Sequence, residues 1–191
     1  MHVIDAADQR LITADDAALA EAASVGDREA FDVLVLRHGP ALYRYARRML
    51  AVESDAADVV QDTFVAAWQQ ITVFRATSTL RSWLFAICYR KIADNYRVKR
   101  DHPVEDWVLE PLQADSTEDP FAAASNAAFI AALEEALAQL PARQRASWIM
   151  REIEQMAYPE IGEVMQLSAD AARGHHHRAT AALRVLLRRW Q

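Results

Sequence analysis

Apolar residues recur along this chain at the three- and four-residue spacing of amphipathic helices. In residues 55–71 the apolar positions fall at i, i+3, i+4 and i+7, from Ala56 to Ile71. A second long helix is predicted from about Leu80 to Arg100, with an apolar stripe of its own. Alternating patterns that would indicate strands are nearly absent. The chain is therefore predicted to be all-α.

Capping signals divide the first part of the chain into four or five predicted helices. Thr13 and Asp16 have the spacing of a capping box, and Asp27 can cap the next helix. Gly39 and Pro40 are predicted to end that helix, because glycine favours the position after a helix and proline cannot continue one. The resulting bundle ends where a segment of different composition begins.

That segment, residues 102–126, contains three prolines, six acidic residues and no lysine or arginine. It shows no sustained period, which is typical of a linker. Helical periodicity resumes at Asn126 and continues, with breaks, to the end of the chain. The sequence therefore predicts two small helical domains, residues 19–101 and 127–191, joined by an acidic linker and preceded by an extension over residues 1–18.

Charge is distributed unevenly around the formal net value of −6. Residues 75–100 carry seven basic residues and one acidic residue, whereas residues 101–135 carry nine acidic residues and no basic one. Residues 171–191 carry five arginines and no acid. Basic segments suit phosphate backbones, because each neutralised phosphate releases counterions. Solvated helix faces would have the same composition, so this pattern alone leaves both interpretations open.

Several classes of protein are not expected. No run of about 18 apolar residues is present, and the first residues lack the basic and apolar regions of a signal peptide, so a cytoplasmic protein without direct membrane insertion is predicted. Cys88 is the only cysteine, which excludes an intrachain disulfide and a zinc site built from cysteines. A buried thiol is the favoured interpretation of Cys88.

Residues 158–190 have the pattern of a helix-turn-helix. Pro159 suits a first helical turn, Leu167 closes the turn, and Ser168 can cap the second helix. Three consecutive histidines, residues 175–177, lie in that second helix. They are splayed about 100° apart and cannot jointly bind one metal ion, so no metal site or cofactor is predicted.

The second helix is predicted to have two faces. His176 shares the apolar face and is expected to be buried, while Arg173, His177 and Arg178 are expected to point outward, where a recognition helix meets the major groove. An ordinary solvated surface is the competing interpretation of that outer face. Because charging a buried imidazole is costly, acid pH is predicted to loosen this domain through His176.

Taken together, these motifs resemble the extracytoplasmic-function (ECF) sigma factors of bacterial RNA polymerase, over nearly all of residues 19–190. In the first half, residues 58–68 resemble region 2.2, residues 74–87 resemble region 2.3, and residues 91–100 resemble region 2.4. In the second half, three segments resemble region 4: residues 140–145, 158–168 and 177–179.

The resemblance implies that Asp58, Gln61 and Asp62 bind the coiled coil of the largest polymerase subunit, beta-prime. Asp58 and Asp62 repel each other at i, i+4 by roughly 0.2–0.5 kcal/mol, so a basic partner explains this face better than helix stability does. A solvated polar face remains the alternative.

The same resemblance implies two sets of promoter contacts. The loop over residues 72–79 occupies the base-capturing position of the family, and melted DNA needs such a pocket with basic residues around it. The implied minus-ten contacts are Arg75, Ser78, Arg81, Lys91, Asn95, Tyr96, Arg97, Lys99 and Arg100. The implied minus-thirty-five contacts are Arg143, Arg145, Arg173, His177 and Arg178. Trp83 is predicted to be a core residue rather than a stacking wedge.

The chain departs from the family pattern in the recognition helix. Family members commonly carry Ser-Arg followed by an aliphatic residue where this chain has Gly174, His175 and His176. Glycine weakens a helix by about 1 kcal/mol relative to alanine, and the missing arginine removes a strong DNA contact. Weak or unusual promoter recognition is therefore expected.

The predicted function is that of an alternative sigma factor, which is not itself an enzyme. It would bind the beta-prime and beta subunits of core RNA polymerase and promoter DNA, and an anti-sigma factor would hold it inactive by covering both domains. Two other interpretations remain: a stand-alone helix-turn-helix regulator, which would leave residues 58–100 without a role, and a helical enzyme that binds metal through Asp58 and Asp62.

Overall fold

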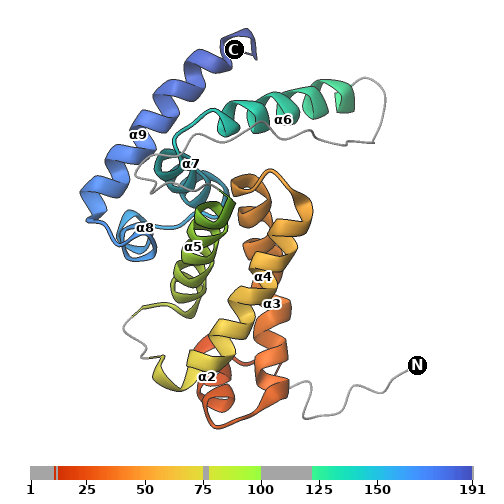
Figure 1. Ribbon diagram of the computed structural model, residues 1–191, viewed down its shortest axis with the longest axis vertical. Coiled ribbons are helices and arrows are strands. Elements are labelled where there is room, and N and C mark those ends of the chain that lie inside the picture. Colours follow the sequence, from red (N-terminus) through yellow and green to blue (C-terminus); the bar gives the residue numbers. More distant parts are fainter. Residues whose placement is uncertain (1–10, 12, 75–77, 100–121, 191) are drawn as a thin grey trace.

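The computed structural model describes residue 11 and residues 13–74, 78–99 and 122–190, within which all regular structure is helical (Figure 1). The first helices form an N-terminal bundle: α2 (Asp16–Ser24), α3 (Arg28–Met49), α4 (Glu53–Gln70), the short 3-10 helix η1 (Ile71–Val73) and α5 (Leu80–Lys99). The later helices form a C-terminal bundle: α6 (Ala122–Ala138), α7 (Ala142–Trp148), the π-helical segment η2 (Ile149–Ile153), α8 (Tyr158–Met165), α9 (Ala169–Leu186) and η3 (Arg188–Trp190). The all-α prediction is confirmed.

The first helix is capped differently from the prediction. Asp15, rather than Thr13, is the N-cap of α2, and its carboxylate accepts a hydrogen bond of 2.8 Å from the backbone N–H of Ala18. Asp16 is already helical, and its carboxylate binds Arg37 and His38 of α3 instead. The capping-box prediction was therefore wrong, because a tertiary contact uses Asp16.

Helix α3 continues through Pro40, so the prediction that Gly39 and Pro40 end the helix was also wrong. Proline removes the hydrogen bond to the carbonyl four residues earlier, that of Leu36. The side chain of Leu36 is 77% exposed, which places that carbonyl on the solvent side of the helix, where water can bind it. The buried face continues past the proline, from Leu34 to Leu42, and holds the helix together.

Aromatic side chains pack the N-terminal bundle. The ring of Phe31 meets Phe64 and Trp68 edge to face, with centroids 6.3 Å and 5.0 Å apart. Trp83 is partly buried against Phe74 at 5.0 Å, so its prediction as a packing residue is confirmed. Cys88 is fully buried, and this burial raises the pKa of its thiol to about 12.

The predicted helix-turn-helix is confirmed as α8 and α9. Proline occupies the first turn of α8, and the hydroxyl of Ser168 accepts from the N–H of Ala171 to cap α9. Between the helices, Gln166 adopts a left-handed conformation with φ 56°. Gly162 permits the tight turn, because an added Cβ would lie 2.7 Å from the carbonyl oxygen of Leu167. Helix α6 begins at Ala122, earlier than the predicted Asn126.

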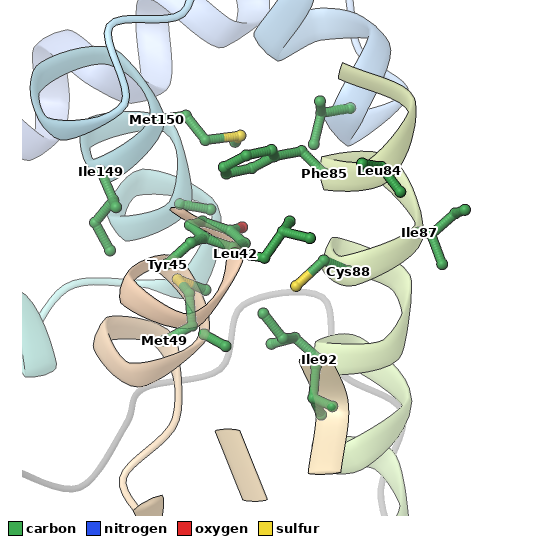
Figure 2. Packing of buried hydrophobic residues seen from close by; sticks show 14 of the residues in the cluster. Leu42, Tyr45, Met49, Leu84, Phe85, Ile87, Cys88, Ile92, Ile149 and Met150 are labelled. Carbon is green, nitrogen blue, oxygen red and sulfur yellow. The ribbon is translucent and has the colours of Figure 1, made fainter. Parts of the chain in front are cut away.

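The two bundles pack against each other through α3 and α5 on one side and α7, η2 and α8 on the other. Figure 2 shows this contact, in which Ile149 and Met150 approach Tyr45 and Phe85. All four side chains are fully buried, and one hydrophobic core spans both bundles. Within the described residues, no helix is both long and apolar enough to cross a membrane.

Candidate functional site

An acidic face lies on α4, opposite the side that packs into the bundle. Asp58, Gln61 and Asp62, the residues that the family resemblance assigns to polymerase binding, are all exposed. The packed side carries Val59 and Thr63, and the buried hydroxyl of Thr63 donates to the carbonyl of Val59 at 2.7 Å. The helix therefore presents its carboxylates to solvent without using them in the core.

This acidic face adjoins the basic helix α5. The ammonium group of Lys91 lies 3.8 Å from a carboxylate oxygen of Asp62, and both side chains are substantially exposed. An exposed ion pair of this kind stabilises a fold by about 0–1 kcal/mol, so it can separate easily. Both residues remain available to other partners.

The middle of α5 carries the most accessible of the predicted minus-ten residues. Lys91 and Asn95 are one turn apart and half-buried, and the Oδ1 atom of Asn95 has no hydrogen-bond partner among the described residues. Arg97 is exposed and pairs with Asp94 at 2.9 Å. Ser78 is half-buried just before α5. The predictions for Arg75 and Arg100, and for the side chain of Lys99, lie outside the described residues.

Tyr96 does not share this accessible surface. It is 9% exposed, and its hydroxyl donates to the backbone carbonyl of Met49, the last residue of α3. This bond ties the end of α5 to the end of α3. In this arrangement the side chain of Tyr96 packs in the core, and its role as a DNA contact stays a prediction.

Arg81 lies at the other end of α5, about 15 Å along the helix from Lys91. Its guanidinium binds the carboxylate of Glu154 at 2.9 Å and lies over the ring of Phe85 at 5.4 Å. Glu154 belongs to the C-terminal bundle and is 3% exposed. Arg81 is thus held at the contact between the bundles, away from Lys91, Asn95 and Arg97.

The outer face of α9 matches its prediction. Arg173, His177 and Arg178 are all exposed. Arg173 pairs with Asp170 at 3.0 Å, and Arg178 donates to a ring nitrogen of His175 at 3.2 Å. Both contacts are exposed and local to the helix, so they leave this face open to a larger partner.

His176 is buried on the inner face, as predicted, and both of its ring nitrogens have partners. One lies 2.8 Å from a carboxylate oxygen of Glu152, and the other lies 3.1 Å from the hydroxyl of Tyr158. The guanidinium groups of Arg151 and Arg173 both lie over the Tyr158 ring, 4.9 Å and 5.2 Å from its centre. His176 and Arg173 of α9 therefore both contact Tyr158 of α8, and these contacts hold the two helices together.

Of the two arginines predicted in α7, only Arg143 is exposed, and its charge acts on the hydroxyl of Tyr89 in the N-terminal bundle. Arg145 is 1% exposed, and burial lowers the pKa of its guanidinium to about 10. It donates to the carbonyl of Met49 at 3.4 Å. In this arrangement the side chain of Arg145 lies between the bundles, and its role as a DNA contact stays a prediction.

Sequence reasoning missed Glu154 and Arg44, which meet across the bundles at 3.4 Å. No local signal marks either residue, since the partners of Glu154 lie 73 and 110 positions away.

Within the described part of the chain, no group of three or more histidine, cysteine, aspartate or glutamate residues is placed to hold a metal ion. The accessible features define a two-bundle helical protein with a helix-turn-helix and a separate acidic docking face.

Comparisons with known proteins identify this class. Two family models match the chain: Sigma-70 region 2 over residues 34–102, and Sigma-70, region 4 over residues 130–183. The chain is 35% identical over 179 residues to RNA polymerase sigma factor CnrH of Cupriavidus metallidurans, covering 90% of this chain and 94% of CnrH. It is 30% identical over 175 residues to ECF RNA polymerase sigma factor SigM of Mycobacterium tuberculosis, covering 90% and 84%.

Solved structures agree with these matches. CnrH in complex with the cytosolic domain of CnrY matches with a TM-score of 0.68 at 36% identity, covering 90% of this chain and 96% of that chain. The sigma factor RpoE in complex with the anti-sigma factor NepR from Bartonella quintana shares the fold, with a TM-score of 0.64 at 24% identity and coverage of 83% and 96%. The chain belongs to the sigma-70 family, in its ECF group, and acts as an alternative sigma factor.

Proposed function

We propose that this sigma factor uses three separate surfaces to bring RNA polymerase to a promoter in the cytoplasm. The acidic face of α4 would bind the beta-prime subunit of core polymerase. Three residues of α5, the half-buried Lys91 and Asn95 and the exposed Arg97, would contact the minus-ten element. The outer face of α9, with Arg173, His177 and Arg178, would contact the minus-thirty-five element in the major groove.

The observation that carries this proposal is the separation of charge between neighbouring helices. Asp58 and Asp62 face solvent on α4, whereas Lys91 and Arg97 face solvent on α5. An acidic and a basic surface can therefore engage a protein and a nucleic acid at the same time. A stand-alone helix-turn-helix regulator would need only α8 and α9 and gives the α4 face no partner.

Transcription from purified components tests the proposed function directly. Core RNA polymerase with this chain should produce run-off transcripts from a subset of a promoter library, and core polymerase alone should not. Binding of the chain to promoter duplexes without any association with core polymerase would favour the stand-alone regulator instead.

The core-binding face gives the first specific prediction. Asp58→Lys should weaken binding to core polymerase about tenfold or more, because it places like charge against a basic partner. Asp58 is suitable because its replacement leaves the pair of Asp62 and Lys91 in place. Surface plasmon resonance with immobilised core polymerase measures the affinity of each variant.

The matched control is Asp32→Lys, which makes the same charge change at an exposed position on α3. It should bind core polymerase like the unaltered chain. Equal weakening by Asp32→Lys and Asp58→Lys would show a general charge effect and would contradict a role for the α4 face.

We further propose that an anti-sigma factor binds this chain across both bundles. The relative CnrH was solved with the cytosolic domain of CnrY, and it matches 90% of this chain. Co-purification of this chain from its host, followed by identification of a protein that releases it for transcription, tests the proposal. A chain that is fully active when isolated and has no inhibitory partner would contradict it.

A further inference from the structure

We infer that this sigma factor closes on itself, and that the Glu154 latch holds it closed without any inhibitor. The Glu154 latch is the carboxylate of Glu154, from the C-terminal bundle, together with the guanidinium groups of Arg44 and Arg81 from the N-terminal bundle. This inference rests on the proposed function, because closure matters only if both bundles must reach separate promoter elements.

The first step concerns the burial of the carboxylate. The side chain of Glu154 is 1% exposed, and one of its oxygens lies 2.9 Å from Arg81 and 3.4 Å from Arg44. Its other oxygen has no hydrogen-bond partner among the described residues. An ionised carboxylate removed from water is costly unless it is paired. Within the described residues, the side-chain groups that pair with the buried charge of Glu154 are the guanidinium groups of Arg44 and Arg81, both from the other bundle.

The local backbone directs Glu154 to that position. The preceding segment, η2, is π-helical, and the N–H of Glu154 bonds the carbonyl of Ile149, five residues earlier, at 3.1 Å. The next residue, Gln155, is left-handed with φ 55°. Both features depart from regular helix and cost free energy, and such departures concentrate where a side chain must be placed for function.

Further polar contacts surround the latch. The hydroxyl of Ser82 on α5 donates to Glu160 of α8 at 3.2 Å. Arg145 of α7 reaches the carbonyl of Met49 at the end of α3. The side chains of Phe85 and Met150 also pack together in the buried contact between the bundles (Figure 2). The closed arrangement thus combines a hydrophobic contact with buried and partly buried polar contacts.

The closed arrangement is incompatible with reading two promoter elements at once. The minus-ten and minus-thirty-five elements are about 25 base pairs apart, which is about 85 Å of duplex at roughly 3.4 Å per base pair. Helix α5 packs on α8, and α8 packs on α9. Packed helices are about 8–10 Å apart, so α5 and α9 are separated by only about 20 Å. The bundles must therefore separate before promoter binding.

Closure also uses residues that the family resemblance assigns to DNA. Arg81 is bound to Glu154, and Arg145 is buried, although both were predicted to contact the promoter. Opening would return both guanidinium groups to solvent. The Glu154 latch therefore makes the exposure of Arg81 and Arg145 depend on whether the two bundles are closed or separated.

Small-angle X-ray scattering of the full chain, without polymerase or DNA, tests this inference. The unaltered chain should scatter as a compact particle. Glu154→Lys should be extended, because its ammonium would face two guanidinium groups, and the ratio of open to closed molecules should rise about 100-fold or more. Glu163→Lys, the same charge change at an exposed position of α8, should stay compact.

A second variant guards against unfolding of the altered bundle. Arg44→Gln with Arg81→Gln leaves the C-terminal bundle unchanged but removes both partners of Glu154, so it should also be extended, with unchanged far-UV circular dichroism. Glu154→Lys combined with Arg81→Glu should restore the compact particle. Compact scattering from both the lysine variant and the double glutamine variant, with helicity intact, would overturn the inference, as would an extended unaltered chain.

The scattering result and the transcription result separate the two proposals. Extended variants of a chain that never directs transcription would contradict the proposed function and leave the latch standing. Conversely, a transcriptionally active chain whose variants all stay compact would contradict the latch alone. If both hold, Glu154→Gln with core polymerase should form promoter complexes at lower concentrations than the unaltered chain, because a larger fraction of molecules can reach both promoter elements.

Discussion

At the scale of single residues, four buried ionisable side chains connect the helices of this protein. His38, Arg145, Glu154 and His176 are each less than 9% exposed, and each lies against a partner from a different helix. The partners differ in kind: a carboxylate for His38 and His176, two guanidinium groups for Glu154, and a carbonyl for Arg145. Removing each of them is therefore expected to have a distinct consequence.

His38 is expected to make the N-terminal bundle sensitive to acid. Burial lowers the pKa of its imidazole below the ordinary value of 6.5, although the nearby carboxylate of Asp16 acts in the opposite direction. The unfolded chain then binds the proton more readily than the folded chain, so stability is intact above about pH 6.5 and declines as the pH falls below it. His38→Gln should reduce this decline, measured by urea unfolding between pH 7.5 and 5.5. His177→Gln, an exposed histidine, should leave the decline unchanged, and an equal effect of both would contradict this account.

His176 has a counter-ion that the sequence did not reveal. The prediction that acid pH loosens the C-terminal bundle assumed an uncompensated charge, whereas Glu152 lies 2.8 Å from the ring. We now expect His176→Leu to destabilise the chain at pH 7.5 by about 1–3 kcal/mol, because it removes two hydrogen bonds and leaves the hydroxyl of Tyr158 without that partner. Thermal unfolding of the full chain measures this loss. An undiminished melting temperature with a flattened pH profile would restore the original hypothesis.

At the scale of elements, the two glycines of the helix-turn-helix have opposite roles. Gly162 lies at the close approach of α8 to the turn, where a Cβ would collide with backbone at 2.7 Å. Gly174 lies within α9, and there a Cβ would only meet the end of the Arg178 side chain at 3.4 Å. The first glycine is required by space, whereas nothing in the structure requires the second.

Alanine at the two positions should therefore have opposite effects. Gly174→Ala should stabilise the chain by about 0.5–1 kcal/mol, because alanine favours the helix and restricts the unfolded chain. Gly162→Ala should destabilise it by about 1–3 kcal/mol through overpacking. Urea unfolding measures both changes. A loss of stability in Gly174→Ala would show that the helix needs flexibility or space at that position.

The helices show where sequence reasoning succeeds. The periods of α4 and α9 correctly placed the exposed Asp58 and Asp62 and the buried His176, because each pattern is contained within a single helix. Helix ends were less predictable. Pro40 was expected to end a helix, but burial on both sides of it outweighed the lost hydrogen bond.

At the scale of the whole molecule, the burial that the sequence did not predict has one physical cause. Tyr96 and Arg145 were predicted on the surface but are buried, through contacts with Met49 that span 47 and 96 positions. Local periodicity carries no information about which faces of separate bundles meet. The same reason explains why Glu154 was missed, since its charge becomes significant only when Arg44 and Arg81 are brought to it.

The fully buried Cys88 can serve as an intrinsic chemical probe of transient opening of the N-terminal bundle. Only a thiolate attacks an alkylating reagent, and a thiol whose pKa is raised to about 12 is almost entirely protonated near neutrality. Modification of the native chain should therefore wait for α5 to detach from α3 and α4. The rate of that reaction would report how often the N-terminal bundle opens, without any foreign label being introduced.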